Sequence, residues 1–507
     1  MAEAGVTIPL NAKDSPGDCE GQPSSTLTPD RKTKLVYTVL LALTIGACGM
    51  CLALRGSTLM DLQRLTSSSL ASASAAVFTC LAAGWVVGGI GGGALLDRFN
   101  KDVLLGLSAV GGGIAVVVIP WCSHIVLLGA AFVIAGIFIA ACDAGGFAVC
   151  FQVWGPAAGP YIHLLNLTFA LGSFLAPLVV EAFLKFSQNQ PIDGLNLVNI
   201  SLHNNSSSMP MISSTPVISS TISDNEIHET VTNRTCGLES SGQLNKLFWC
   251  TFVMMGGVLV MASIPFFAVS CRKHKAYETG AANVETKGPK FDKKFFTKII
   301  LLLTCFSFFN NAIEETFGGF LKVFALKQLC WSESMGNMLL SLYWGMYTLF
   351  RFLGFLEALW IHPGKTVLLH TAAVALSFYT LIIVTLWDKW LIFSSVLIGI
   401  AISPIYGARI AWTDRYIAVT GKVMGVICVA EGMGSIVWPA LVGYLMEHFG
   451  PLCFVYMLCF LGTVTLVLFT VMHCIAKSHG ERFPSENAEN SQELQVPLEG
   501  RSCSSRK

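Results

Sequence analysis

Residues 125–150 read IVLLGAAFVIAGIFIAACDAGGFAVC, a run with one charged side chain, Asp143. A helix of about 20 apolar residues spans a lipid bilayer. Working outward from this run, we find eleven others of the same kind. We therefore predict an all-α membrane protein with twelve transmembrane helices at residues 35–55, 71–96, 103–121, 125–150, 160–185, 246–270, 297–325, 334–357, 366–387, 390–411, 422–446 and 451–476.

The composition agrees with a membrane protein. The chain has 507 residues, of which 53% are hydrophobic and 12% charged, whereas soluble domains carry about 25% charged residues. The mean hydropathy is +0.63, and the net charge of +1 indicates no nucleic-acid partner. We find no P-loop, GxSxG or HExxH motif. We therefore expect no enzyme, no cofactor and no metal site beyond a transported ion.

The polar and basic segments divide the chain into two halves. We predict a disordered cytoplasmic tail over 1–34, a six-helix bundle over 35–270, a cytoplasmic loop over 271–296, a second six-helix bundle over 297–476 and a disordered cytoplasmic tail over 477–507. The middle loop is rich in Lys and Arg, which places it and both termini in the cytoplasm. Two halves of six helices are typical of major facilitator transporters.

The loop at 187–245 is long and polar, and the same scheme places it outside the cell. It carries sequons, the acceptor sites for N-glycosylation, at Asn199, Asn204, Asn205 and Asn233. Most cysteines fall within apolar runs. Cys236 and Cys330 lie in segments predicted to be outside, where they could form a disulfide.

The loop after the second predicted helix reads GALLDRFNK over residues 93–101. It resembles the loop signature of the major facilitator superfamily, and Gly93, Asp97, Arg98 and Lys101 are the residues that match. Asp97 can face a helix N-terminus, and the basic residues can hold neighbouring helix ends. We interpret the loop as a latch that biases the access state. The simpler alternative is a cytoplasmic turn of mixed charge.

Carboxylates within predicted spans are expensive to bury and are therefore candidate functional residues. Asp143 could bind Na⁺ or take up a proton, and its alternative is a structural salt bridge. Glu431 is the second candidate for ion coupling, and it either faces a cavity or pairs with a cation elsewhere. Because adjacent helical residues point about 100° apart, at most one of Glu314 and Glu315 should face the cavity squarely.

Amide and aromatic side chains near these carboxylates suit a polyhydroxylated solute. Asn310, Asn311 and Glu314 lie within one turn and offer hydrogen bonds to hydroxyl groups. Tyr343 and Trp344 lie in the middle of the next helix, and we favour Trp344 as the ring that stacks on a sugar. Arg55 and Asp61 are expected at the outer end of the first helix, in a structural role. Gly172, Pro177, Gly434 and Pro439 occupy matching positions in the two halves and predict bends or close packing of helices.

As a set, several short stretches resemble the sodium-dependent glucose transporters in the fucose-permease-like branch of the major facilitator superfamily. These stretches are 55–62, 142–146, 153–155, 171–178, 314–319, 410–416 and 419–422. The resemblance implies Na⁺-coupled or facilitated uptake of a hexose across the plasma membrane, with Asp143 at the coupling site. The chain departs from the family pattern at Arg55, Ser57, Phe147 and Asn166. Asn166 replaces a histidine of the presumed substrate cavity.

The residues leave three functions open. The first is a Na⁺/hexose symporter, with a sugar, Na⁺ and the bilayer as partners. The second is a sodium-independent uniporter or pore for a small neutral solute, in which Asp143 is structural. The third is a membrane receptor or scaffold, for which the tail at 480–507 offers no specific motif.

Overall fold

The computed structural model describes residues 31–96, 98–154, 159–188, 246–271, 293–357, 360–417, 419 and 421–481. Within these ranges the regular structure is entirely helical, which confirms the predicted all-α fold class. In the described part of the chain, eleven helical segments are long and apolar enough to cross a membrane. A twelfth helix in the described part, α10, has 25 residues and carries Glu333, Arg351 and Glu357, which lower its hydropathy.

The first half folds into one bundle. Its elements are α1 (Arg31–Leu65), α2 (Leu70–Ser74), the π-helix η1 (Ala75–Thr79), α3 (Cys80–Leu96), α4 (Lys101–Val118), η2 (Ile119–Trp121), α5 (Ile125–Trp154), α6 (Gly159–Gln188) and α8 (Lys246–Cys271). Elements α2, η1 and α3 follow one another directly and form a single spanning segment.

The second half forms the other bundle. Its elements are α9 (Lys293–Leu329), α10 (Glu333–Glu357), α11 (Pro363–Thr380), η4 (Leu381–Thr385), α12 (Trp390–Ile402), α13 (Ile405–Tyr416), α14 (Gly421–His448) and α15 (Cys453–His479). The predicted helix at 390–411 is divided between α12 and α13, since the chain turns at Ser403 and Pro404.

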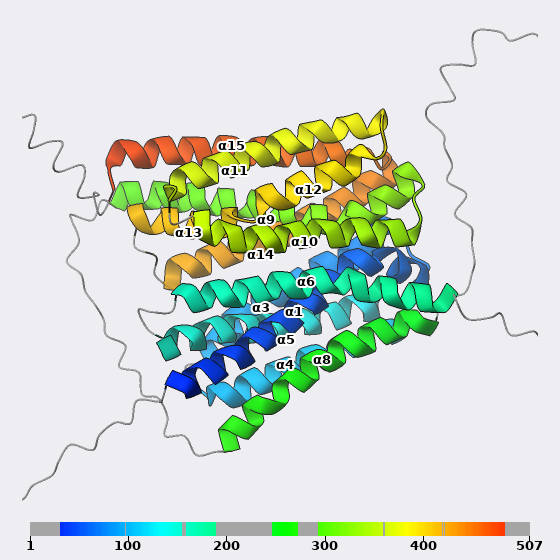
Figure 1. Cartoon of the computed structure of the whole chain (residues 1–507), viewed down its shortest axis with the longest axis horizontal. Coiled ribbons are helices and arrows are strands. Elements are labelled where there is room, and N and C mark those ends of the chain that lie inside the picture. Colours follow the sequence, from blue (N-terminus) through cyan, green and yellow to red (C-terminus); the bar gives the residue numbers. More distant parts are fainter. Residues whose placement is uncertain are drawn as a thin grey trace, which may run out of the picture.

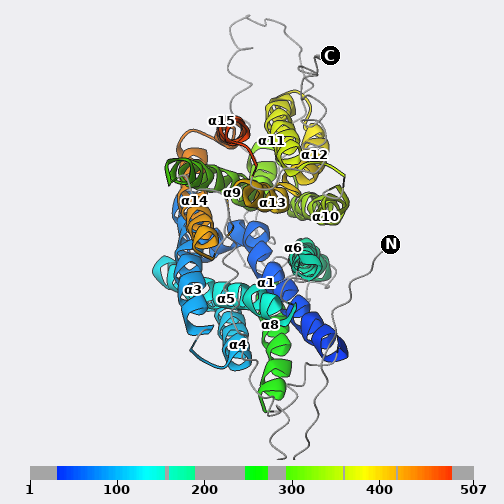
Figure 2. The ribbon, with the colours of Figure 1, turned by 90° about the vertical axis from the view of Figure 1, so that its left-hand side faces the viewer.

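The two bundles lie side by side, with the helices of both running roughly parallel (Figure 1). Seen along the helices, α6 lies beside α10 at one flank, and α14 lies beside α3 at the other (Figure 2). Between these flanks, α1 packs against α9. This arrangement leaves the middle of the interface as the place where both bundles can contribute to a site.

Matching glycines bring helices together within each bundle. A methyl group at Gly172 of α6 would lie 1.9 Å from the carbonyl oxygen of Gly46 in α1. A methyl group at Gly434 of α14 would lie 2.3 Å from the carbonyl oxygen of Phe308 in α9. Only glycine permits such contact between backbones. The predicted close packing is therefore present, and it occurs at matching positions of the two halves of the chain.

We call the end of the molecule where α1, α6, α9 and α14 finish the outer end, because the predicted orientation places it outside the cell. Polar contacts join the two bundles there. Arg64 of α1 forms an ion pair with Glu333 of α10 at 2.6 Å. Glu447 of α14 accepts from the backbone N–H of Ala71 in α2 at 2.8 Å. These contacts hold the bundles together at the outer end.

Two buried groups add to this closure. Glu181 of α6 is buried and accepts hydrogen bonds from Ser334 and Asn337, both in the first turns of α10. Lys322 of α9 is fully buried, and its amine donates to the backbone oxygen of Ser57 in α1. Opening the outer end would expose both groups to water and break these bonds.

The first helix differs from its predicted length. It was predicted over 35–55 and extends to Leu65, so Arg55 lies well within it. Arg55 is buried rather than placed at the outer end, which overturns that expectation. The hydropathy window stopped early because Arg55, Asp61 and Arg64 lower the average, whereas the helix keeps these charges paired with other side chains.

Several predictions lie partly or wholly outside the described residues. These are both tails, most of the 187–245 loop with Asn199, Asn204, Asn205 and Asn233, and most of the middle loop. Cys330 is disulfide-bonded. The other half of the proposed pair, Cys236, is outside the described part, so that pairing stays a prediction.

The loop motif is described in part. Gly93 lies in α3, Arg98 is exposed in the turn, and Asp97 is outside the described residues. Asn100 caps α4 by accepting from the N–H of Asp102 at 3.0 Å. Lys101 donates to Gln152 of α5 at 2.5 Å. This basic residue therefore holds a neighbouring helix end of the same bundle, and a role in switching access stays a prediction.

Candidate functional site

A cavity of about 220 Å³ lies between the two bundles. Helices α1, α3, α5 and α6 with η1 line it from the first bundle, and α9, α10, α13 and α14 line it from the second. Its polar lining comes mainly from the second bundle, through Asn311, Glu314, Glu315, Tyr347, Arg351, Tyr406, Glu431 and Ser435. The first bundle supplies Arg55, Asp143, Asn166 and Ser173 together with apolar and aromatic side chains.

Asn311 is held in place by α14. Its amide nitrogen donates to the backbone oxygen of Glu431 at 2.9 Å and to the hydroxyl of Ser435 at 2.7 Å. Both amide hydrogens are therefore used. The carbonyl oxygen of Asn311 remains as an acceptor for a hydroxyl group of a bound solute.

Glu314 belongs to a second network, which connects α9 with α10. The Tyr347 hydroxyl donates to Glu314 at 2.9 Å, and Arg351 donates to that same hydroxyl. The Arg351 guanidinium also lies over the rings of Tyr347 and Tyr406, at 5.0 and 5.5 Å from their centroids. Glu314 thus has a neighbouring positive charge that reaches it through a tyrosine.

Glu431 both faces the cavity and pairs with a cation. The two alternatives left open by the sequence are therefore both true. Its carboxylate lies 2.5 Å from the guanidinium of Arg409 in α13. Arg409 is fully buried and also donates to Ser307 of α9 at 3.1 Å. Because the pair lies within one bundle, it can persist when the bundles move relative to each other.

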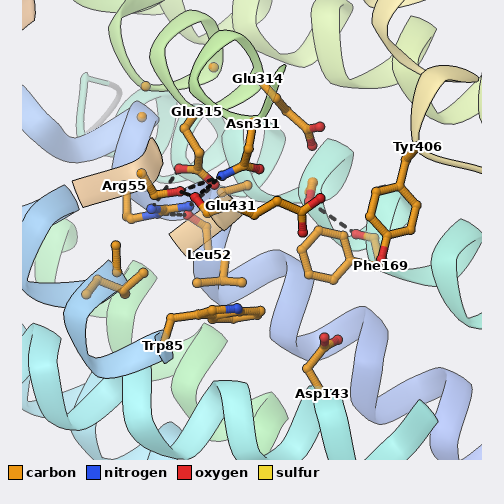
Figure 3. A pocket seen from close by; sticks show the side chains of 18 of the residues that line it. Leu52, Arg55, Trp85, Asp143, Phe169, Asn311, Glu314, Glu315, Tyr406 and Glu431 are labelled. Atoms are coloured by element: carbon orange, nitrogen blue, oxygen red, sulfur yellow. Dashed lines mark hydrogen bonds and ion pairs between the residues drawn. The ribbon is translucent and has the colours of Figure 1, made fainter. Parts of the chain in front are cut away.

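Arg55 and Glu315 form an ion pair between the bundles. The two guanidinium nitrogens of Arg55 lie 3.0 and 3.2 Å from the two carboxylate oxygens of Glu315 (Figure 3). Arg55 also donates to the backbone oxygen of Leu52 at 2.7 Å and lies 5.3 Å from the ring centroid of Phe78. Both Glu314 and Glu315 line the cavity, although only one was expected to face it squarely.

Asp143 differs from the other carboxylates of the cavity. Glu314, Glu315 and Glu431 each have a named hydrogen-bond or ion-pair partner. Among the described residues, Asp143 makes neither a hydrogen bond nor an ion pair, and it stands apart from the polar network in Figure 3. The predicted alternative of a structural salt bridge has no partner in that part of the chain. The arrangement leaves Asp143 able to bind a cation or a proton.

The structure brings most of the predicted site residues together. Asp143, Asn166, Asn311, Glu314, Trp344 and Glu431 all line the cavity. Asn310 does not, since it is buried and faces a smaller pocket inside the second bundle. Tyr343 is fully buried and packs against Phe317. The direct substrate contact proposed for Asn310 and Tyr343 does not fit these positions, because each points away from the cavity.

Sequence reasoning missed several residues of the lining. Arg351 of the lining and Arg409, the buried partner of Glu431, carry a signal that could have been used, since each is a charge within an apolar span. Trp85 and Phe169 carry no such signal, because aromatic residues are common in membrane helices for packing alone, whereas Phe147 was noted only as a departure from the family pattern. Their role as lining depends on how α3, α5 and α6 are rotated within the bundle.

Comparison with known proteins shows relatives of this chain in sequence and in fold. Residues 299–502 match the family described as Major Facilitator Superfamily. The mouse protein named sodium-dependent glucose transporter 1A is 26% identical over 431 residues, covering 84% of this chain and 94% of the mouse protein.

Two solved structures have the same fold. A bacterial homologue of the human lysosomal transporter Spinster, inward-facing and unoccupied, gives a TM-score of 0.59 at 14% identity, covering 88% of this chain and 97% of that one. A D-xylose-proton symporter gives 0.59 at 12% identity, covering 87% and 97%. The resemblance expected from the short stretches is confirmed: this chain has the fold of major facilitator transporters and is similar over most of its length to sodium-dependent glucose transporter 1.

Proposed function

We propose that this protein is a secondary active transporter that carries glucose or a related hexose together with Na⁺ by alternating access. We place it in the plasma membrane, with both termini in the cytoplasm. The names of its relatives support a sugar as substrate. The observation that best supports coupling to Na⁺ is the carboxylate of Asp143, which has no partner among the described residues and lines the cavity between the bundles.

The charges of the cavity support a cation at Asp143. Arg55 and Arg409 neutralise Glu315 and Glu431, and Arg351 lies beside Glu314 through Tyr347. An unpaired carboxylate in a site of low water content is unfavourable. A hard cation that prefers oxygen ligands would restore the balance of charge there.

The remaining lining suits a hexose. The carbonyl oxygen of Asn311, the carboxylate of Glu314 and the amide of Asn166 offer hydrogen bonds to hydroxyl groups. In the proposed cycle, Na⁺ at Asp143 favours the state open at the outer end, which then accepts the sugar. Closure of the outer contacts follows, and the bundles rock about the site.

Sugar uptake tests this proposal directly. Cells that express the protein take up labelled glucose in Na⁺ buffer and in a matched buffer with choline in place of Na⁺. We expect uptake to depend on Na⁺, and Asp143→Asn to abolish that dependence. Glu431→Gln is the matched control, because it removes a carboxylate of the same cavity that already has an arginine partner. It should weaken uptake and keep the dependence on Na⁺.

The alternative is a passive uniporter or pore, in which Asp143 is structural. Uptake that is the same in Na⁺ and choline, in both wild type and Asp143→Asn, would favour that alternative. An additional measurement applies an inward proton gradient in choline buffer. Faster uptake under that gradient would identify a proton as the coupling ion. Absence of hexose uptake, with normal surface expression, would contradict the proposed substrate class.

A further inference from the structure

Seven aromatic side chains line the cavity, and four of them already have partners. The rings of Phe78 and Tyr347 lie under guanidinium groups, of Arg55 and Arg351 respectively. Tyr406 lies between Arg351 and Arg409, and Trp344 packs against Tyr343 and Tyr347. Trp344, the ring favoured from the sequence, is also buried. Each of these four rings therefore already interacts with a cation or with another aromatic ring.

Trp85 of α3 is different. It lines the cavity and is half-buried. Within the described residues its ring contacts neither another aromatic ring nor a cation. Phe147 and Phe169 share this property, and all three side chains also pack against apolar clusters of the protein. Among the described lining residues, Trp85 is therefore the largest aromatic ring without an aromatic or cationic partner.

The position of Trp85 relative to the polar groups has a chemical consequence. Figure 3 shows Trp85 on one side of the space and Asn311, Glu314 and Glu315 on the other. A pyranose in its chair form carries its equatorial hydroxyls around its rim and C–H bonds on its two faces. An aromatic ring on one side and hydrogen-bonding groups on the other match that distribution.

We infer that Trp85 is the stacking platform of the substrate site, and that the site selects a pyranose whose face toward Trp85 bears only C–H bonds. This inference rests on the proposed hexose transport and names the residue that determines specificity. Stacking against a single ring makes the site sensitive to one face of the sugar only. Glucose has equatorial hydroxyls at all the ring carbons that distinguish the hexoses. Either of its faces therefore meets the requirement that only C–H bonds point toward Trp85.

Epimers of glucose separate the two faces. Mannose and galactose carry their axial hydroxyl on one face of the ring, and allose carries it on the other. A hydroxyl directed at Trp85 would separate the sugar from the ring. We therefore expect wild type to discriminate against mannose and galactose together, or against allose, according to which face meets Trp85.

The test measures the Michaelis constants for uptake of glucose, mannose, galactose and allose in wild type, Trp85→Phe and Trp85→Leu. In Trp85→Leu, the KM for glucose should rise about three- to tenfold. The ratio of the KM for the disfavoured epimer class to the KM for the accepted class should fall by a similar factor. Trp85→Phe keeps a ring and should retain most of the discrimination. Ratios of KM are independent of how much protein reaches the surface.

Trp344→Phe is the matched control, since it alters a buried tryptophan of the same cavity whose ring already has partners. It should leave the order of the sugars unchanged. Unchanged epimer ratios in Trp85→Leu, with normal uptake of glucose, would overturn the role of Trp85 and leave the proposed transport standing. Absence of uptake for all four sugars in wild type would overturn both.

Discussion

Glu315→Gln should shift the protein toward the state that is open at its outer end. In the closed arrangement, Glu315 of α9 meets Arg55 of α1 through two contacts of 3.0 and 3.2 Å. In the proposed cycle of alternating access, the bundles separate on this side. The ion pair therefore stabilises the closed arrangement and contributes little once the outer end opens and water reaches both charges.

The size of the shift follows from the burial of the pair. The side chains of Arg55 and Glu315 are 10% and 24% exposed, so water screens the interaction only in part. Hydrogen bonds to charged groups contribute about 1.5–3 kcal/mol. A glutamine still accepts one bond from Arg55 but removes the opposite charge. A loss of about 2 kcal/mol would lower the equilibrium constant for closure about 30-fold.

A cysteine at Leu340 reports this equilibrium. Leu340 of α10 is fully buried, and a methyl group at Gly56 of α1 would lie 3.4 Å from its side chain, which places it where the bundles meet. A membrane-impermeant thiol reagent added outside should react with Leu340→Cys only while the outer end is open. We expect labelling to be many times faster when Glu315→Gln is also present.

Glu431→Gln is the control in the same cysteine background, because its pair with Arg409 lies within one bundle and is unaffected by separation of the two. Equal labelling rates with and without Glu315→Gln would refute the idea that this pair holds the outer end closed. An equal increase with Glu431→Gln would mean that loss of any cavity carboxylate loosens the structure.

Three further predictions follow from the packing and the buried charges. Gly172→Ala should sharply reduce thermal stability, measured by unfolding in detergent, because its methyl group would lie 1.9 Å from a carbonyl oxygen of α1, whereas Gly89→Ala, with nothing within 4 Å, should not. Arg409→Met should destabilise the protein by about 3 kcal/mol, because it leaves the half-buried carboxylate of Glu431 without its partner. Adding Glu431→Gln should restore part of the melting temperature. Lys322→Met should accelerate external labelling of Leu340→Cys, because it removes a buried hydrogen bond between α9 and α1 at the outer end. An unchanged labelling rate would show that this bond has no part in closure.

The carboxylates of the cavity were visible in the sequence because a charge within an apolar run stands out. Asp143, Glu314, Glu315 and Glu431 were all found in this way, and all four line the cavity. The ion-pair partners of these carboxylates were harder to predict from the sequence. Arg55 and Glu315 are 260 residues apart in the chain, and no local pattern relates them.

Neighbouring positions show a second limit. Asn311 lines the cavity and Asn310 does not, and Trp344 lines it while Tyr343 does not. One residue along a helix is a rotation of about 100°. Since these helices are apolar on most sides, the hydropathy pattern does not determine their rotation. That rotation is set by contacts with the neighbouring helices, such as the close approach of α14 to α9 at Gly434.

The sequence by itself determined the membrane class, the order of the spanning helices and the carboxylates of the site. These properties depend on transfer of local segments from water to lipid, which sums over neighbouring residues. Only the tertiary structure decided which carboxylates have partners, that Asp143 is left alone among the described residues, and that Trp85 lies across the cavity from the polar groups. Those properties depend on distances between helices far apart in the chain, which are set when the two bundles pack together.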